Sequence, residues 1–216
     1  MSNQLVLWGV GTSRTIRAHW AMHELGLDYE RRPIQARSGE TKTPEYTKLN
    51  PRQKVPLLQD GDFVIGESAA IVAYLSQTYS GRERSLVPEQ ARDFAKWLEW
   101  CFFIVAELDS TSLYVMRRHG THKGLAHIYG HAPEVVASAG EYFRQQLRHV
   151  EVALSDQRQY LMGDQFTSAD ILLTTCLSWA IDYGVGICDN AVPYLERTTS
   201  RPAYAKSQAA NAPTKC

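Results

Sequence analysis

The sequence contains few cysteines and no pair with the spacing of a metal site or a redox motif. Its four cysteines stand at positions 101, 176, 188 and 216, without a Cys-x-x-Cys pair. A disulfide framework is therefore not expected. An excess of charge of one sign is also missing, because 23 Lys and Arg balance 23 Asp and Glu. Without a net positive field, neither nucleic acid nor an anionic membrane is an expected partner.

Long hydrophobic runs are absent as well. The longest, such as Ile171 to Cys176, fall far short of the roughly 20 residues that a membrane span needs. The start, MSNQLVLWG, lacks the basic residues and the long apolar stretch of a secretory signal. With 44% hydrophobic residues in 216, the composition is that of an ordinary globular protein, and we expect a cytoplasmic location.

The first 80 residues carry alternating strand and helix signals. Leu5 to Trp8 is a continuous apolar run, typical of a buried strand, and Gly26 is placed to end the helix that follows. Asp60-Gly61 between two short apolar runs predicts a tight hairpin. The pattern predicts strand, helix, strand, then strand, strand, helix, over residues 5–8, 16–27, 29–34, 55–58, 63–65 and 67–79.

Beyond residue 92 the sequence shows only helical patterns. A polar stretch with Gly81 and Pro88 is typical of a linker. Thr167 and Asp170 have the spacing of a capping box at the start of a helix. Helices are predicted over residues 94–118, 135–155, 167–183 and 194–200, and the polar tail over 206–216 is expected to be frayed.

Two segments of the first half resemble a known family. Residues 49–58 read Leu-Asn-Pro-Arg-Gln-Lys-Val-Pro-Leu-Leu, and residues 66–71 read Gly-Glu-Ser-Ala-Ala-Ile. They are similar to the Asn-Pro-x-x-Lys-Val-Pro and Glu-Ser-x-Ala-Ile segments of the cytosolic glutathione transferases, in the bacterial type that uses a serine or threonine hydroxyl. The strand-turn-helix over residues 5–26 and the capping box match that family in order and spacing.

The resemblance implies a fold and a domain organisation. A thioredoxin-like α/β domain (βαβ-ββα) that binds glutathione is expected over residues 1–80, followed by a linker over 81–92. An all-α helical bundle that shapes the pocket of the second substrate is expected over residues 93–216. The resemblance also implies a homodimer.

Three positions are expected to hold the γ-glutamyl and cysteinyl parts of glutathione. The resemblance implies a cis peptide bond before Pro56, which would leave the Val55 backbone free to pair with the cysteinyl backbone. The alternative is that Pro56 merely begins an edge strand. Glu67 and Ser68 stand where a strand meets a helix, and such a helix start attracts anions. Ser68 suits the γ-glutamyl carboxylate and Glu67 the ammonium group, but an ordinary helix cap would use the same two residues.

The glycyl carboxylate of glutathione requires a cation or an amide. Lys54 is the preferred candidate, with Lys42 and Gln53 close by in the sequence. Thr41 is a further candidate, and Lys42, Thr41 and Gln53 can equally be solvated loop residues.

The catalytic group must hold the glutathione sulfur as a thiolate, which is the nucleophile. Lowering a thiol pKa from about 8.5 to about 6.5 requires about 2.7 kcal/mol, which one hydrogen bond to the charged sulfur can supply. Trp8 occupies the tyrosine position of other classes and lacks a hydroxyl. The family's spacing favours Thr12, with Ser13 beside it as the alternative, and both residues can also simply cap the helix. Arg14 stands where some bacterial classes carry a cysteine, and its guanidinium can support the thiolate.

We therefore predict a transferase that conjugates glutathione to small hydrophobic electrophiles in detoxification. Glutathione is a co-substrate, and no metal or redox cofactor is expected, although four histidines crowd residues 119–131. One alternative is a specialised dehalogenase, ether-cleaving enzyme or isomerase of the same fold. A second alternative is a non-catalytic binding or regulatory module.

Overall fold

The computed structural model describes residues 4–81 and 85–213. The chain divides into two compact units. The first contains the described residues up to Val87 together with those from Thr199 onward, and the second is Pro88–Thr198. None of the described helices is both long and apolar enough to span a membrane.

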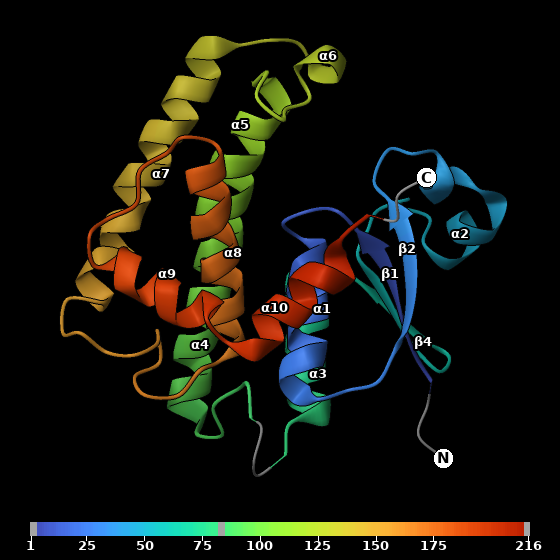
Figure 1. Cartoon of the computed structure of the whole chain (residues 1–216), viewed down its shortest axis with the longest axis horizontal. Coiled ribbons are helices and arrows are strands. Elements are labelled where there is room, and N and C mark those ends of the chain that lie inside the picture. Colours follow the sequence, from blue (N-terminus) through green and yellow to red (C-terminus); the bar gives the residue numbers. More distant parts are fainter. Residues whose placement is uncertain (1–3, 82–84, 214–216) are drawn as a thin grey trace. The chain divides into compact units, whose positions relative to one another are not determined.

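A four-stranded mixed sheet forms the centre of the first unit (Figure 1). Its order is β2-β1-β3-β4, where β1 is parallel to β2 and antiparallel to β3, and β3 is antiparallel to β4. The apolar runs predicted as strands account for most of it, and Gly61 at φ 62° makes the predicted hairpin turn. The strands are β1 (Leu5–Val10), β2 (Glu30–Gln35), β3 (Leu57–Asp60) and β4 (Phe63–Gly66).

Helices α1 (Thr15–Leu25) and α3 (Ser68–Tyr79) complete the βαβ-ββα order that the sequence predicted. Trp20 of α1 and Ile71 of α3 are fully buried, and Gly26 in the left-handed region ends α1. The stretch between β2 and β3, for which the sequence predicted neither helix nor strand, contains the short 3₁₀ helix η1 (Glu40–Lys42) and α2 (Pro44–Leu49). A proline at the first turn and the side chain of Thr43 begin α2.

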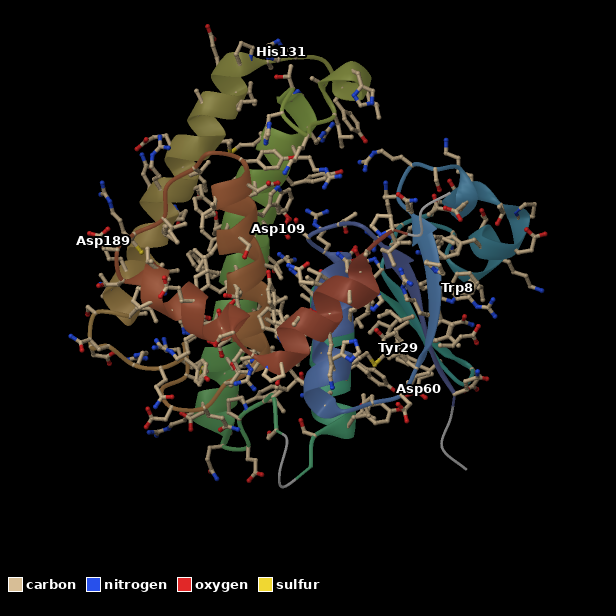
Figure 2. The ribbon with its side chains drawn as sticks, in the orientation of Figure 1. Trp8, Tyr29, Asp60, Asp109, His131 and Asp189 are labelled. Atoms are coloured by element: carbon tan, nitrogen blue, oxygen red, sulfur yellow. The ribbon has the colours of Figure 1, made fainter. Side chains whose placement is uncertain are left out.

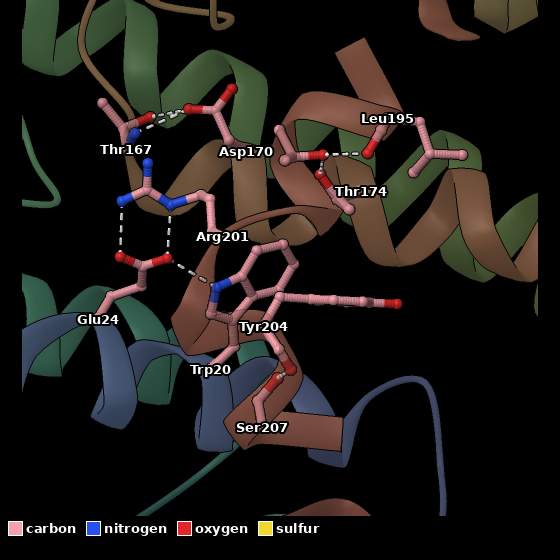
Figure 3. Close-up of polar contacts among 10 residues, drawn as sticks. Trp20, Glu24, Thr167, Asp170, Thr174, Leu195, Arg201, Tyr204 and Ser207 are labelled. Atoms are coloured by element: carbon pink, nitrogen blue, oxygen red, sulfur yellow. Dashed lines mark hydrogen bonds and ion pairs between the residues drawn. The ribbon is translucent and has the colours of Figure 1, made fainter. Parts of the chain in front are cut away.

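The prediction of a frayed tail from residue 206 is wrong. Helix α10 (Pro202–Asn211) packs along α1, so the end of the chain belongs to the first unit rather than to a helical domain that reaches residue 216 (Figure 1). Residues 214–216 of that tail lie outside the described part. Arg201 binds both carboxylate oxygens of Glu24 at 2.6 and 2.7 Å (Figure 3). Trp20 donates to the same carboxylate at 2.9 Å and lies edge-on to Tyr204. The helix is therefore fixed by an ion pair and an aromatic contact, neither of which is local in sequence.

The regular elements of the second unit are helices, apart from an isolated β-bridge between Tyr160 and Gly163. The helix predicted over 94–118 is confirmed, because the chain is helical without a gap from Ala91 to His119. Its middle part, η2, is a π-helix in which the Ser112 hydroxyl donates to the carbonyl of Glu107 at 2.6 Å. Helix α7 packs against η2 and α5. The helices are α4 (Ala91–Phe103), η2 (Ile104–Leu113), α5 (Tyr114–His119), α6 (Ala126–Tyr129), α7 (Pro133–Ala153), α8 (Ser168–Asp182) and α9 (Ala191–Thr199).

The predicted capping box at the start of α8 is present. The Thr167 amide donates to Asp170 Oδ2 at 2.7 Å, as Figure 3 shows. Asp170 is fully buried and also accepts from the Leu161 amide at 2.9 Å and from the Tyr194 hydroxyl at 2.8 Å. The carboxylate thus joins the start of α8 to two neighbouring segments.

Candidate functional site

The topology of the first unit gathers the candidate residues at one edge of its sheet. Strands β1 and β4 run in the same direction, because each is antiparallel to β3. Their carboxyl ends therefore lie at the same edge, where α1 and α3 begin and where β3 starts directly after Pro56. The predicted turn, the proline segment and the Glu67–Ser68 helix start all belong to this edge.

The Val55–Pro56 peptide bond is cis, as the resemblance implied. Two hydrogen bonds hold the segment before this bond. The Lys54 carbonyl accepts from the Tyr46 hydroxyl at 2.5 Å and from the Asn50 side-chain amide at 2.8 Å. Burial raises the pKa of Tyr46 to about 12, so this phenol keeps its proton near neutral pH. The backbone at Val55 is thereby presented in one fixed conformation.

A glycine allows this segment to approach β1 closely. Gly9 has φ 112°, and a Cβ placed on it would lie 2.5 Å from Cβ of Val55. Its carbonyl can only accept, so Nε2 of His19 carries the proton and donates to it at 3.1 Å, and Nδ1 accepts from the Tyr29 hydroxyl at 2.7 Å. Desolvation lowers the pKa of His19 to about 4 and raises that of Tyr29 to about 12. The neutral His19 ring thus holds the Gly9 carbonyl near the end of β1, just before the turn. Nothing in the sequence indicated this contact.

The start of α3 has two arginine partners that sequence reasoning missed. Glu67 has φ 66°, and its carboxylate pairs with Arg52 at 2.6 Å, with both side chains more than half exposed. Ser68 is buried, and its hydroxyl accepts from the buried Arg17 of α1 at 3.3 Å. The first contact joins the loop before Pro56 to α3, and the second joins α1 to α3.

The turn before α1 holds the two candidate hydroxyls. Thr12 Oγ accepts from the amides of Thr15 at 3.0 Å and Arg14 at 3.3 Å, and it lies 3.0 Å from Thr15 Oγ. Thr12 therefore caps the helix, one of the two roles that the sequence left open for it. The half-buried Ser13 hydroxyl forms no hydrogen bond within residues 4–81 and 85–213. Arg14 is half-buried at the first position before α1.

Three of the residues proposed for the glycyl carboxylate differ in their hydrogen bonding and in their distance along the chain from the cis-proline segment. Lys42 and Lys54 are exposed and form no ion pair with the part of the chain that the structure describes. Gln53 is held in the loop, because its side-chain amide donates to Thr47 at 3.1 Å. Lys54 adjoins the cis-proline segment directly, whereas Lys42 reaches the same edge through β2, which runs parallel to β1.

Trp8 and the histidine-rich segment have other partners. Trp8 donates from its indole nitrogen to Gln59 at 2.5 Å, and Figure 2 shows it on the sheet. His119 and His122 bond to the backbone carbonyls of Gly130 and Asp182. Among the described residues, no group of three or more His, Cys, Asp and Glu is arranged to hold a metal ion.

Comparison with known proteins places this architecture in a family. The model of the glutathione S-transferase N-terminal domain matches residues 3–77, and that of the C-terminal domain matches residues 133–206. The chain is 32% identical to glutathione S-transferase 3 of Zea mays over 95% of its length and 94% of that protein.

Solved structures share the whole fold. A theta class glutathione S-transferase from Xanthomonas axonopodis pv. citri, with glutathione bound, is 26% identical, with a TM-score of 0.79 over 95% of this chain and 97% of that one. The beta-etherase LigF of Sphingobium sp. strain SYK-6 has a TM-score of 0.81 at 19% identity, over 94% of this chain and 98% of that one, which shows a common fold alone. From the two family models and the full-length similarity to the maize protein, this chain belongs to the glutathione S-transferase family.

Proposed function

We propose that this protein transfers the sulfur of glutathione to small, largely apolar electrophiles. The observation that carries the proposal is the meeting, at one sheet edge, of a cis-proline segment, a helix start with a buried serine, and a turn with an uncommitted hydroxyl. The theta class structure from Xanthomonas axonopodis pv. citri, which is 26% identical to this chain and has the same fold, contains bound glutathione. This supports glutathione as the co-substrate.

The tripeptide fits this edge as follows. The Val55 backbone pairs with the cysteinyl backbone, and Ser68 with the first amides of α3 receives the γ-glutamyl carboxylate. The Glu67 carboxylate, which already pairs with Arg52, faces the ammonium group. Lys54, with Lys42 and Gln53 as further candidates, neutralises the glycyl carboxylate.

The sulfur is stabilised by a hydroxyl of the turn that precedes α1. The sequence placed Thr12 before Ser13, but the hydrogen bonds of the turn support the reverse order. Thr12 already accepts two backbone amides and has Thr15 Oγ as a partner for its proton. Ser13 carries a donor without a partner in the described chain. A neighbouring Arg14 guanidinium and the positive end of α1 add to the stabilisation of a thiolate.

Direct titration of the bound thiol tests this function. Calorimetry should first show saturable glutathione binding, and the thiolate absorbance of the complex should then titrate about two pH units below that of free glutathione. Absent binding at millimolar glutathione would favour the non-catalytic module. Binding with an unshifted thiol would refute the thiolate mechanism.

A substrate panel then resolves the reaction. Aryl halides, haloalkanes, aryl ethers and double-bond isomers distinguish simple conjugation from the dehalogenase, ether-cleaving and isomerase alternatives. We further propose a cytoplasmic homodimer that acts in detoxification, which sedimentation and cell fractionation can test.

A further inference from the structure

The last described turn of the chain lies on the turn that carries the candidate hydroxyls. Asn211, at the end of α10, accepts from the Gly11 amide through its own carbonyl at 2.9 Å and through its side-chain Oδ1 at 3.1 Å. The same Oδ1 accepts from the Thr15 hydroxyl at 2.6 Å, and Nδ2 donates to the Thr12 carbonyl at 3.2 Å. One side chain thus contacts three residues of the turn that lie about 200 positions earlier.

Only a carboxamide matches this set of partners. The Gly11 amide can only donate and the Thr12 carbonyl can only accept, so the two ends of the Asn211 side chain are assigned by their neighbours. A carboxylate would face the Thr12 carbonyl with like charge, and an apolar side chain would leave both groups without this partner. The geometry is therefore specific to asparagine.

Asn211 also determines where the protons of the turn point. The Thr15 hydroxyl has a single proton and two acceptors within reach, Asn211 Oδ1 at 2.6 Å and the Thr12 carbonyl at 3.0 Å, and the shorter contact favours Asn211. Thr15 Oγ is then an acceptor toward the Thr12 amide and the Thr12 hydroxyl, both at 3.0 Å. Thr12 is held in this way, and the Ser13 hydroxyl next to it keeps a proton without a partner among the described residues.

Gly11 makes room for the end of the chain. Its φ is 81°, and a Cβ at this position would lie 3.1 Å from Cγ of Pro213. Arg31 of β2 donates to the carbonyl of Ala212, the residue between Asn211 and Pro213. Strand β2, the turn and the last described residues therefore form one connected layer over the start of α1.

We propose that Asn211 is a positioning residue for the thiolate: it orders the turn Gly11–Thr15 so that a turn hydroxyl is aimed at the glutathione sulfur. This inference deepens the proposed function and rests on it. Asn211 acts through Thr12 and Thr15, without itself touching the sulfur.

Helix α10 has other contacts that should keep it in place when the Asn211 side chain is removed. Its other end is fixed by the Arg201–Glu24 pair and by the Trp20–Tyr204 contact. Replacement of Asn211 by alanine should therefore perturb the turn without detaching the helix. Gln208 offers a matched control, because it is an exposed amide on the same helix whose side chain, among the described residues, bonds only to Tyr204 of α10, at 2.7 Å.

The test compares the wild-type protein with Asn211→Ala, Gln208→Ala, Thr15→Val and the double variant Asn211→Ala/Thr15→Val. Measured are the pKa of the bound glutathione thiol, kcat and KM for glutathione with an aryl halide, and the denaturant midpoint. We expect Asn211→Ala to raise the thiol pKa by about half to one unit and to lower kcat about three- to tenfold at pH 7, with KM within about twofold. Gln208→Ala should match the wild type. The double variant should resemble Thr15→Val, because the two residues act along one path.

The outcomes separate the two proposals. In the first outcome, the thiol pKa in the wild-type complex is lower than that of free glutathione, and Asn211→Ala has the same pKa as the wild type. This result overturns the positioning role and leaves the transferase function intact. An equal loss in Asn211→Ala and Gln208→Ala, or a loss that follows the denaturant midpoint alone, also overturns it. A wild-type complex whose thiol titrates as free glutathione does overturns the proposed function and this inference together.

Discussion

Two helix starts of this protein, those of α8 and α1, solve the same physical problem in opposite ways. Each presents unpaired backbone amides and the positive end of a helix dipole. At α8 a local carboxylate, Asp170, accepts from the Thr167 amide in a capping box and is itself buried. At α1 no acidic residue stands in the first turn, and neutral hydroxyls from Thr12 and Thr15 take its place.

The difference separates a structural helix start from one that can receive an anion. A carboxylate at the start of α1 would neutralise the field that stabilises a thiolate. Hydroxyls satisfy part of the amides and leave the positive potential in place. Because hydroxyls bind more weakly than a carboxylate, the turn needs further support, which Asn211 supplies from α10.

Breaking the closed start should produce the largest effect. Asp170→Ala removes an acceptor from the amides of Leu161 and Thr167 and from the Tyr194 hydroxyl, all of them buried. We expect the free energy of unfolding to fall by about 3–5 kcal/mol, measured by chemical denaturation. The control Asp182→Ala, at the exposed other end of α8, should cost less than about 1 kcal/mol. Equal losses in the two variants would contradict the role given to the capping box.

Falling pH should act on the region of α1 through His19. Its pKa is about 4 in the folded protein against 6.5 in the unfolded chain, so the unfolded state binds the proton more readily. The resulting stability is fully present above pH 6.5 and is lost as the pH falls toward 4, by about 3 kcal/mol. Denaturation between pH 4 and 7 should show this slope, and His19→Gln should reduce it. A smaller slope should remain from His23, whose pKa burial also lowers. A variant that keeps the wild-type slope would show that another group titrates.

Emptying the open start should change chemistry rather than stability. Ser13→Ala should raise the pKa of the bound thiol by one to two units and lower kcat about ten- to one-hundredfold, with the denaturant midpoint unchanged. Thr12→Val should instead cost about 1 kcal/mol of stability through the lost cap, with a smaller effect on the thiol. If Thr12→Val moves the thiol pKa and Ser13→Ala does not, the original preference for Thr12 is correct.

A third helix start, that of α3, extends the comparison, and its variants should have the smallest effects. Ser68→Ala removes a buried hydroxyl that Arg17 contacts, and Glu67→Gln removes the partner of Arg52. Each should weaken glutathione binding about tenfold in calorimetry, without a change in the bound thiol's pKa. A loss of kcat at unchanged affinity would assign these residues to the chemical step instead.

Much of the fold was predictable because its signals are local. The apolar runs of β1 and β3, the glycine that ends α1 and the Thr167–Asp170 box each lie within a few residues of the structure they specify. Helices α2 and α10 were missed although each begins with a proline at its first turn. Their apolar faces are too small to produce periodicity.

The partners within the site were not predictable, because they are far apart in the chain. Arg17 and Ser68 are 51 positions apart, and Asn211 and Gly11 are 200. No residue pattern within a window indicates such contacts. The ring of His19, which fixes Gly9, is likewise an ordinary helical residue in the sequence.

By itself the sequence determined the βαβ-ββα order of the first unit, the Val-Pro and Glu-Ser segments, and the presence of hydroxyls in the turn before α1, because each depends on neighbouring residues. The cis bond before Pro56 was implied by the family resemblance. Only the tertiary structure decided which hydroxyl is free to donate, which arginines support the start of α3, and that the end of α10 lies on the turn. These features depend on contacts between side chains that are distant in sequence, and the packing of the sheet, α1 and α10 determines those contacts.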